Sequence, residues 1–161
     1  MSGILRWQNA VTYDVTQADG AMTTELNSLA SGSGVIASNP IDNTLSTNLK
    51  GWLALSCNLP SVPTGTGSPT VDMYALPLNQ DGSTFGDGTT SGTTAPASGQ
   101  YLGSFSFNPS LAAGTRTDVL LVQREILPAK FKLFAMNQLG NALGSANNVI
   151  GFALLTDNLN G

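Results

Sequence analysis

The sequence GWLALSCNL, residues 51–59, alternates between two faces without a break. One face is apolar throughout and carries Leu53, Leu55, Cys57 and Leu59. Strict alternation over a run of this length is typical of a β-strand with one face on a hydrophobic core. We therefore predict a strand here, with Cys57 buried as a small apolar side chain.

Similar alternation recurs on both sides of this segment. Further strands are predicted at residues 71–77, 101–107, 116–126, 130–137 and 147–156, with shorter ones at 4–15 and around Val35 and Ile36. Pro77 ends one strand or places it at a sheet edge, and Asn108 with Pro109 ends another. Within residues 101–107, the alternation predicts one shared face for Tyr101, Phe105 and Phe107.

One short helix is predicted after Asp19, because Met22, Leu26 and Leu29 have helical spacing and Gly32 can terminate the helix. Short strands with turn-rich connections predict an all-β fold, an antiparallel β-sandwich of jelly-roll-like type. A chain of 161 residues fits a single domain, residues 1–161.

Two connections between the predicted strands are long, at residues 60–69 and 79–100. The second contains thirteen Gly, Ser or Thr residues and a single large apolar residue, Phe85. Loops of this length are uncommon unless they are functional or disordered. We keep two interpretations open: a mobile surface loop, and an arm that becomes ordered against a neighbouring subunit.

Charged residues make up only 10% of the chain, against about 25% in an average protein. The surface must therefore consist mostly of neutral polar groups, which suits a protein that packs against neighbours. Six basic and ten acidic residues give a net charge of −4. This balance leaves no basic patch for phosphate groups, so we expect no binding to nucleic acid.

The side chains that carry most enzyme chemistry are missing. The chain has no histidine and a single cysteine, which rules out His-based nucleophile activation, zinc sites of the His/Cys type and an internal disulfide. We predict no catalytic residues, no metal and no cofactor, and we interpret Asp81-Gly82 and Asp87-Gly88 as turns, not as a calcium loop. No apolar run approaches a membrane span, so we expect the chain to be made in the cytoplasm, with no membrane partner.

The C-terminal third carries a resemblance to a known group of proteins. Leu127-Pro128-Ala129-Lys130-Phe131-Lys132-Leu133 is followed by Asn137, Gly140, Leu143, Ser145, Asn147 and Val149. Upstream, the pattern continues with Asp42-Asn43-Thr44, Leu53 to Leu55, Val71-Asp72-Met73-Tyr74-Ala75-Leu76-Pro77, Asp81-Gly82, Phe85 and Asp87-Gly88. Over roughly residues 30–149 the chain resembles small structural proteins of tailed-bacteriophage virions, and it departs from them in the more apolar end Gly151-Phe152-Ala153-Leu154-Leu155.

This resemblance implies a β-sandwich without enzymatic activity, located in the virion. The leading hypothesis is a capsid cement or decoration protein that contacts the major capsid protein or neighbouring virion subunits. A homo-oligomer is expected, with a trimer as the commonest symmetry for such a role. The alternative is a neck or tail accessory subunit. A third hypothesis, from another class, is a carbohydrate- or receptor-binding module that uses Trp7, Tyr13 and Tyr74.

The alternation also predicts where contacts could form. If Phe131, Leu133 and Ala135 face the core, their neighbours in the same strand face outward, and both faces of the last strand are apolar. An apolar patch of this kind usually marks an interaction surface, unless residues 19–43 cover it within the chain. The candidate interface residues are Phe85, Lys130, Lys132, Phe134, Met136, Ile150, Phe152 and Leu154.

Overall fold

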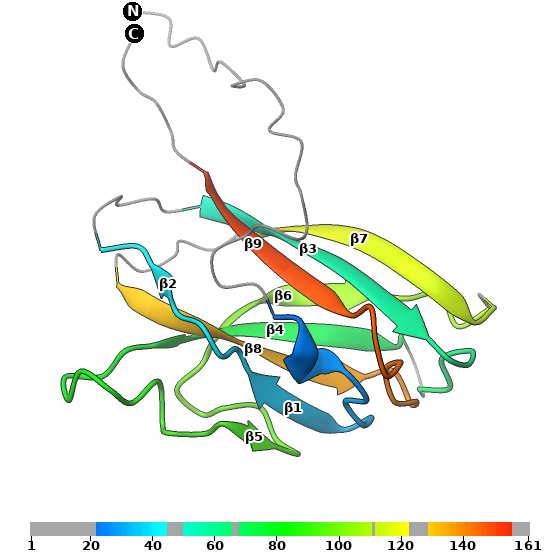
Figure 1. Ribbon diagram of the computed structural model, residues 1–161, viewed down its shortest axis with the longest axis horizontal. Helices are drawn as coiled ribbons and strands as arrows, with labels where there is room; N and C mark the ends of the chain where they lie inside the picture. The colour runs from blue at the N-terminus through cyan, green and yellow to red at the C-terminus, as the bar shows by residue number, and fades with distance from the viewer. Residues whose placement is uncertain (1–21, 45–49, 66–67, 111, 123–128, 156–161) are drawn as a thin grey trace, which may run out of the picture.

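The computed structural model describes residues 22–44, 50–65, 68–110, 112–122 and 129–155 (Figure 1). Within these ranges the chain forms nine strands and one 3₁₀ turn, η1 (Thr24–Leu26). The strands are β1 (Ser33–Ile36), β2 (Ile41–Asp42), β3 (Lys50–Leu59), β4 (Thr70–Pro77), β5 (Ser91–Gly92), β6 (Gln100–Ser106), β7 (Gly114–Val122), β8 (Lys130–Gln138) and β9 (Val149–Leu155).

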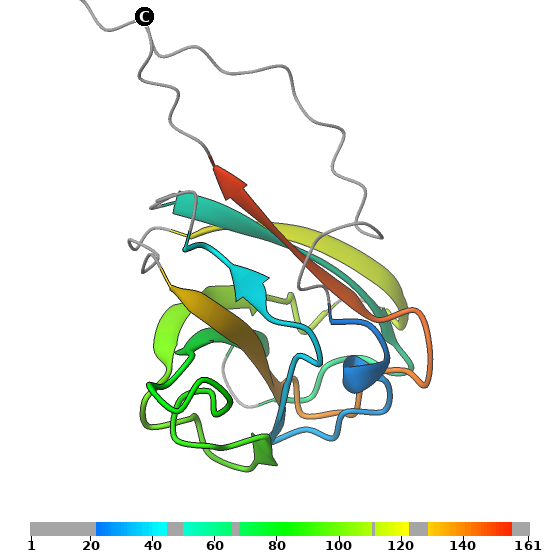
Figure 2. The same ribbon diagram turned by 60° about the vertical axis from the view of Figure 1, so that its left-hand side comes forward.

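The strands form two sheets that pack face to face. The larger sheet has six strands in the order β5-β1-β8-β4-β6, with β2 also paired to β8, and the smaller has the order β7-β3-β9. Every pairing between these strands is antiparallel. Figures 1 and 2 show the smaller sheet lying across one face of the larger one. The predicted all-β antiparallel sandwich is confirmed.

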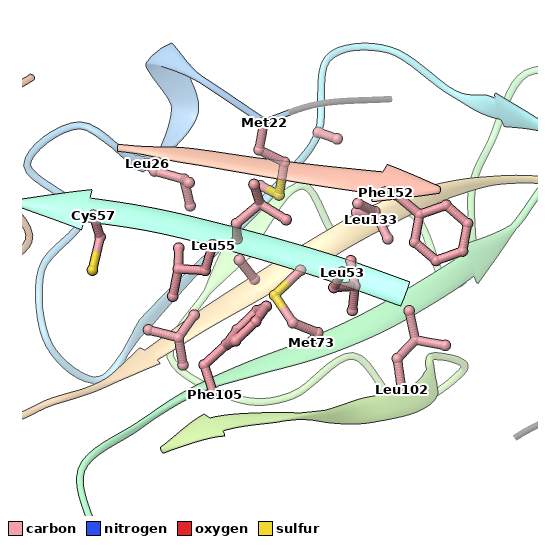
Figure 3. Packing of buried hydrophobic residues seen from close by; sticks show 14 of the residues in the cluster. Met22, Leu26, Leu53, Leu55, Cys57, Met73, Leu102, Phe105, Leu133 and Phe152 are labelled. Carbon is pink, nitrogen blue, oxygen red and sulfur yellow. The ribbon is translucent and has the colours of Figure 1, made fainter. Parts of the chain in front are cut away.

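The core lies between the two sheets and is built by the alternation that the sequence shows. Leu53, Leu55 and Cys57 point inward from β3, where they meet side chains from the larger sheet such as Met73 (Figure 3). Phe131 of β8 and Phe152 of β9 join the sheets by an edge-to-face contact, with ring centroids 5.7 Å apart. Burying one such large apolar side chain contributes about 1.5–3 kcal/mol, so the core supplies most of the stabilisation.

Most predicted strands are confirmed to within a few residues. The strand expected at 116–126 is β7, which ends at Val122, and residues 123–126 lie outside the described part of the chain. The strand expected at 4–15 also lies outside it. The two-residue strands β2 and β5 were not expected, because two residues show no periodicity.

The predicted helix is reduced to the single turn η1. Met22 pairs with Ile150 as an antiparallel bridge, in which each backbone N–H donates to the other residue's carbonyl at 2.8 Å. The Thr23 side chain makes no capping hydrogen bond, and Asn27 already has extended backbone. Met22 and Leu26 are both fully buried, so their spacing reflects core contact by an almost extended segment.

A β-bulge overturns the predicted facing of Tyr101 and of its neighbour Leu102 in β6. Met73 pairs with Gly103 but Tyr74 pairs with Tyr101, so Leu102 is inserted as an extra residue. Leu102 and Phe105 therefore both point into the core, and Tyr101 turns outward instead of sharing a face with Phe105. Gly103 has φ +143°, in the region that favours glycine, and so permits the bulge.

Candidate functional site

The outer face of β8 is apolar, as expected, but it is covered. Phe134 is 0% exposed and Met136 is 6% exposed. With Leu76 they form a second, smaller cluster against which Ile36, Tyr74 and Phe85 pack. Of the two interpretations, an exposed patch and a patch covered within the chain, the second is correct, because Ile36 of β1, within residues 19–43, and Phe85 of the loop 79–100 pack on these side chains.

The loop 79–100 is folded onto its own sheet. Its one large apolar residue, Phe85, packs on the smaller cluster, and the ammonium group of Lys132 lies 5.1 Å from the centre of its ring. The Asn79 side chain donates to the carbonyl of Gly86 at 2.7 Å, and β5 pairs with β1. Two of the candidate interface residues, Phe85 and Lys132, thus hold this loop on the large sheet.

The two acidic turns of this loop cap backbone N–H groups. Asp81 accepts hydrogen bonds from the backbone N–H groups of Ser83 and Thr84, and Asp87 accepts from those of Thr89 and Ala97. Hydrogen bonds, first that from the Thr84 hydroxyl, lower the pKa of Asp81 to about 2. Both carboxylates are thus engaged in turn geometry, and the described residues contain no group of three or more His, Cys, Asp or Glu that could hold a metal ion.

The remaining candidate residues separate into buried and exposed ones. Ile150 is 0% exposed and Phe152 4% exposed, and both belong to the core between the sheets. Lys130 forms an exposed ion pair with Asp42, with 3.4 Å between nitrogen and oxygen. Leu154 lies in β9 opposite Gly51, and its side chain is outside the described part of the structure. The candidate residues therefore do not form one surface.

A different apolar surface lies on the outer side of the smaller sheet. The register aligns three cross-strand rows there, whose described side chains are all uncharged: Trp52, Ala54, Ser56, Thr117, Val119, Val149, Gly151 and Ala153. Val119 is 58% exposed and Trp52 39% exposed, two of the four exposed large apolar residues in the described ranges. We call this surface the neutral face.

No described helix is long and apolar enough to cross a membrane.

The charges of β7 lie on the other side of the smaller sheet. Arg116 and Asp118 pair with Cys57 and Leu55, so they point to the inner side at the edge of the sandwich. Arg116 donates to the backbone carbonyls of Ala112 and Thr115. Inward-pointing charges on an edge strand discourage edge-to-edge aggregation. The described side chains of the neutral face thus carry no charge, while the adjacent edge is protected.

A polar and aromatic surface lies on the outer side of the larger sheet, across β4 and β6. The rings of Tyr74 and Tyr101 have centroids 5.4 Å apart and planes inclined at 57°. The hydroxyl of Tyr101 is hydrogen-bonded to that of Ser104, which in turn donates to Oδ1 of Asp72. Burial raises the pKa of Tyr74, as do, to a smaller extent, the nearby Asp72 and Tyr101. We call these four residues the tyrosine face.

Sequence reasoning found only Tyr74 of the tyrosine face. In a regular strand, residues 101 and 104 lie on opposite faces, because successive side chains alternate. The bulge at Leu102 brings them to the same face. A glycine inside an alternating segment is the one signal that could have indicated it, since such a glycine suggests a bulge.

Two buried asparagines organise the loops at one end of the sandwich. Asn137 donates to the carbonyls of Leu29 and Asn141 and accepts from the N–H of Leu139. Asn148 accepts from the N–H of Asn58, and its amide donates to Gly144. Asn137 lies near the end of β8 and Asn148 immediately before β9, so each fixes a loop where it joins a strand.

The described residues thus present two outer faces of opposite character. The neutral face carries no ionisable side chain, whereas the tyrosine face has a carboxylate at its centre. Comparison with known proteins gives no matching family model, no matching curated protein and no matching solved structure. The two faces are therefore the basis on which a function can be argued.

Proposed function

We propose that this protein is a structural subunit of a tailed-phage particle, most specifically a capsid cement or decoration protein that acts by contact. The observation that carries this proposal is the neutral face on β7, β3 and β9. The cores of protein interfaces are depleted in charged residues, as this face is. Covering an apolar sheet face that lies in water lowers the free energy, so a partner that covers the neutral face is stabilised there. The resemblance to virion proteins gives the partner class.

The small and apolar side chains in the middle row of the neutral face suit a partner of similar polarity. Val119 is 58% exposed and flanks Ala54, whose row continues to Gly151. Small residues leave this middle row without a charged or long side chain. A neutral, flat partner surface could therefore approach the strands closely without leaving a polar group unsatisfied.

The size of the neutral face bears on the kind of complex. Three strands about 4.8 Å apart and about six residues long give roughly 300 Å² in projection. A stable pairwise interface buries about 800 Å² on each partner. The neutral face alone is therefore too small for a stable dimer, and we propose that it acts together with other contacts across adjacent shell subunits. A protein that binds only the assembled shell stabilises it by mass action.

The second candidate is a neck or tail accessory subunit in which loops reach between subunits. Its support is weaker, because the loop 79–100 packs on its own sheet through Phe85 and pairs with β1 through β5. Counting copies per particle distinguishes the two, since a shell protein is present in far more copies than a ring subunit.

The test is binding to shells that lack this protein. We expect Val119→Lys to weaken binding about tenfold or more, since a buried unpaired charge costs several kcal/mol. Thr94→Lys, which adds the same charge at an exposed position of the loop 79–100, should bind like the unmodified chain. Equal binding by both variants, with unchanged melting temperatures, would exclude the neutral face as the contact surface.

A further inference from the structure

The tyrosine face has the geometry of a small preorganised platform. Tyr74 is flanked by its cross-strand neighbour Phe134 on β8, whose ring lies 6.4 Å away in an edge-to-face arrangement. Tyr101, on the edge strand β6, is 39% exposed and leans against Tyr74. A buried phenylalanine and a β-bulge thus fix one ring and aim the other, and bulges commonly re-aim a side chain in this way. Little conformational entropy remains to be lost on binding.

Hydrogen-bonding groups beside the rings are already ordered. Because Ser104 donates its proton to Asp72, the Tyr101 hydroxyl is the donor to Ser104. The chain of hydrogen bonds therefore runs from Tyr101 through Ser104 to the carboxylate of Asp72, and it fixes the orientation of that carboxylate. The second carboxylate oxygen of Asp72 accepts no hydrogen bond from the described residues, and Asp72 is only half-buried. This oxygen is an acceptor available to a ligand that carries hydroxyl groups.

From these observations we infer that the tyrosine face is a binding site for a neutral saccharide. A pyranose ring has an apolar face of C–H groups that packs on an aromatic ring, and a rim of hydroxyls that donate to a carboxylate. Tyr74 and Tyr101 supply the first contact, and Asp72 supplies the second. The site is independent of the neutral face, which lies on the opposite sheet, so this inference does not rest on the proposed structural role.

The charge and size of the platform argue for this class of ligand. Asp72 disfavours acidic sugars, and the nearest cation on this sheet, Lys132, is placed over Phe85 at the far end of β4. A protein partner would need a much larger area, and it would have to desolvate a carboxylate at the centre of the contact, where interfaces are depleted in charge. The contact area of a sugar of one or two rings is similar to the area that the four residues of the tyrosine face present.

The experiment is an NMR titration of the full chain. The probes are the neutral hexasaccharides of glucose (α-1,4 and β-1,4), mannose, galactose and N-acetylglucosamine, with a polygalacturonate hexamer as the acidic probe. We expect saturable shifts of the amides of residues 72–74 and 101–104 with at least one neutral probe, and weaker binding of the acidic probe.

Matched variants separate a saccharide site from a structural role. We expect Tyr101→Ala to weaken binding about tenfold or more, and Tyr101→Phe, which keeps the ring, to stay within about threefold. Asp72→Asn should also weaken binding, whereas Val119→Ala, on the opposite sheet, should leave it unchanged. Melting temperatures establish that each variant is folded.

Three results would overturn the inference. The first is the absence of saturable binding with every neutral probe. The second is binding that Tyr101→Ala and Asp72→Asn leave intact, or that favours the acidic probe. The third is that a virion protein binds this chain and that Tyr101→Ala abolishes this binding, since that would assign the platform to a protein contact.

Discussion

Replacing Asn148 by alanine should destabilise the fold more than any surface asparagine does, and the size of the effect follows from its contacts. Asn148 is 1% exposed, and its Oδ1 accepts from the N–H of Asn58 at 2.9 Å. Its amide donates to Gly144 at 2.7 Å and to Asn27 at 2.9 Å. These bonds join β3, the segment after η1 and the loop before β9, which are far apart in the sequence.

The free energy can be worked out from these three bonds. Each contributes about 1 kcal/mol net, and leaving buried partner groups unsatisfied adds about 1–2 kcal/mol. Asn148→Ala should therefore lower the free energy of unfolding by about 4–5 kcal/mol, a large part of the roughly 5–15 kcal/mol typical of a domain. The exposed Asn108 accepts one local hydrogen bond from Ser110, so Asn108→Ala is the control and should cost less than about 1 kcal/mol.

The assay is equilibrium unfolding in urea, followed by tryptophan fluorescence and circular dichroism. The account predicts a lower midpoint for Asn148→Ala with an unchanged slope, because the surface exposed on unfolding stays the same. If Asn148→Ala and Asn108→Ala differ by less than about 1 kcal/mol, the hydrogen-bonded asparagine is not what holds this end of the sandwich together.

Three further predictions concern the bulge, the core thiol and an acidic turn. Gly103→Ala should lower the free energy of unfolding by about 2–3 kcal/mol, because φ is +143° and the new Cβ would lie 2.8 Å from a methyl group of Leu120. In the same urea assay Gly92→Ala, whose new Cβ would have no neighbour closer than 3.9 Å, should be near neutral. Burial raises the pKa of Cys57 to about 11, so the folded protein should resist a thiol reagent at pH 8 and react fully in urea; rapid labelling of the folded chain would refute its burial. Hydrogen bonds lower the pKa of Asp81 to about 2. The stability that its carboxylate contributes is therefore present above the ordinary pKa of aspartate and is lost as the pH falls through about 2. An NMR titration that gives an unperturbed pKa for Asp81 would contradict the turn geometry.

The long strands of this fold can be predicted because alternation is a local signal. Leu53, Leu55 and Cys57 face the core as their spacing indicates, and the apolar outer face of β8 follows from the same rule. The sequence does not indicate what covers that face. A single phenylalanine in a loop rich in glycine, serine and threonine, Phe85, gives no periodic pattern, although it packs on the cluster that contains Phe134 and so helps to cover the patch.

The candidate surfaces were harder to predict, for two physical reasons. The neutral face depends on which strands are neighbours, since Val119 and Ala54 are brought together only by the pairing of β3 with β7. The tyrosine face depends on a bulge that reverses the orientation of Tyr101, and one inserted residue changes the face of every side chain before it. The roles of Asn137 and Asn148 depend on partners far away in the sequence, the carbonyl of Leu29 and the N–H of Asn58, and local spacing does not indicate such pairs.

The most direct test of the central proposal is cryo-electron microscopy of the intact particle that contains this chain. The account predicts many copies at equivalent positions on the shell, each with Trp52 and Val119 on β3 and β7 turned toward a capsid subunit. Density confined to the tail, or a shell contact made through another surface with Val119 facing solvent, would contradict it.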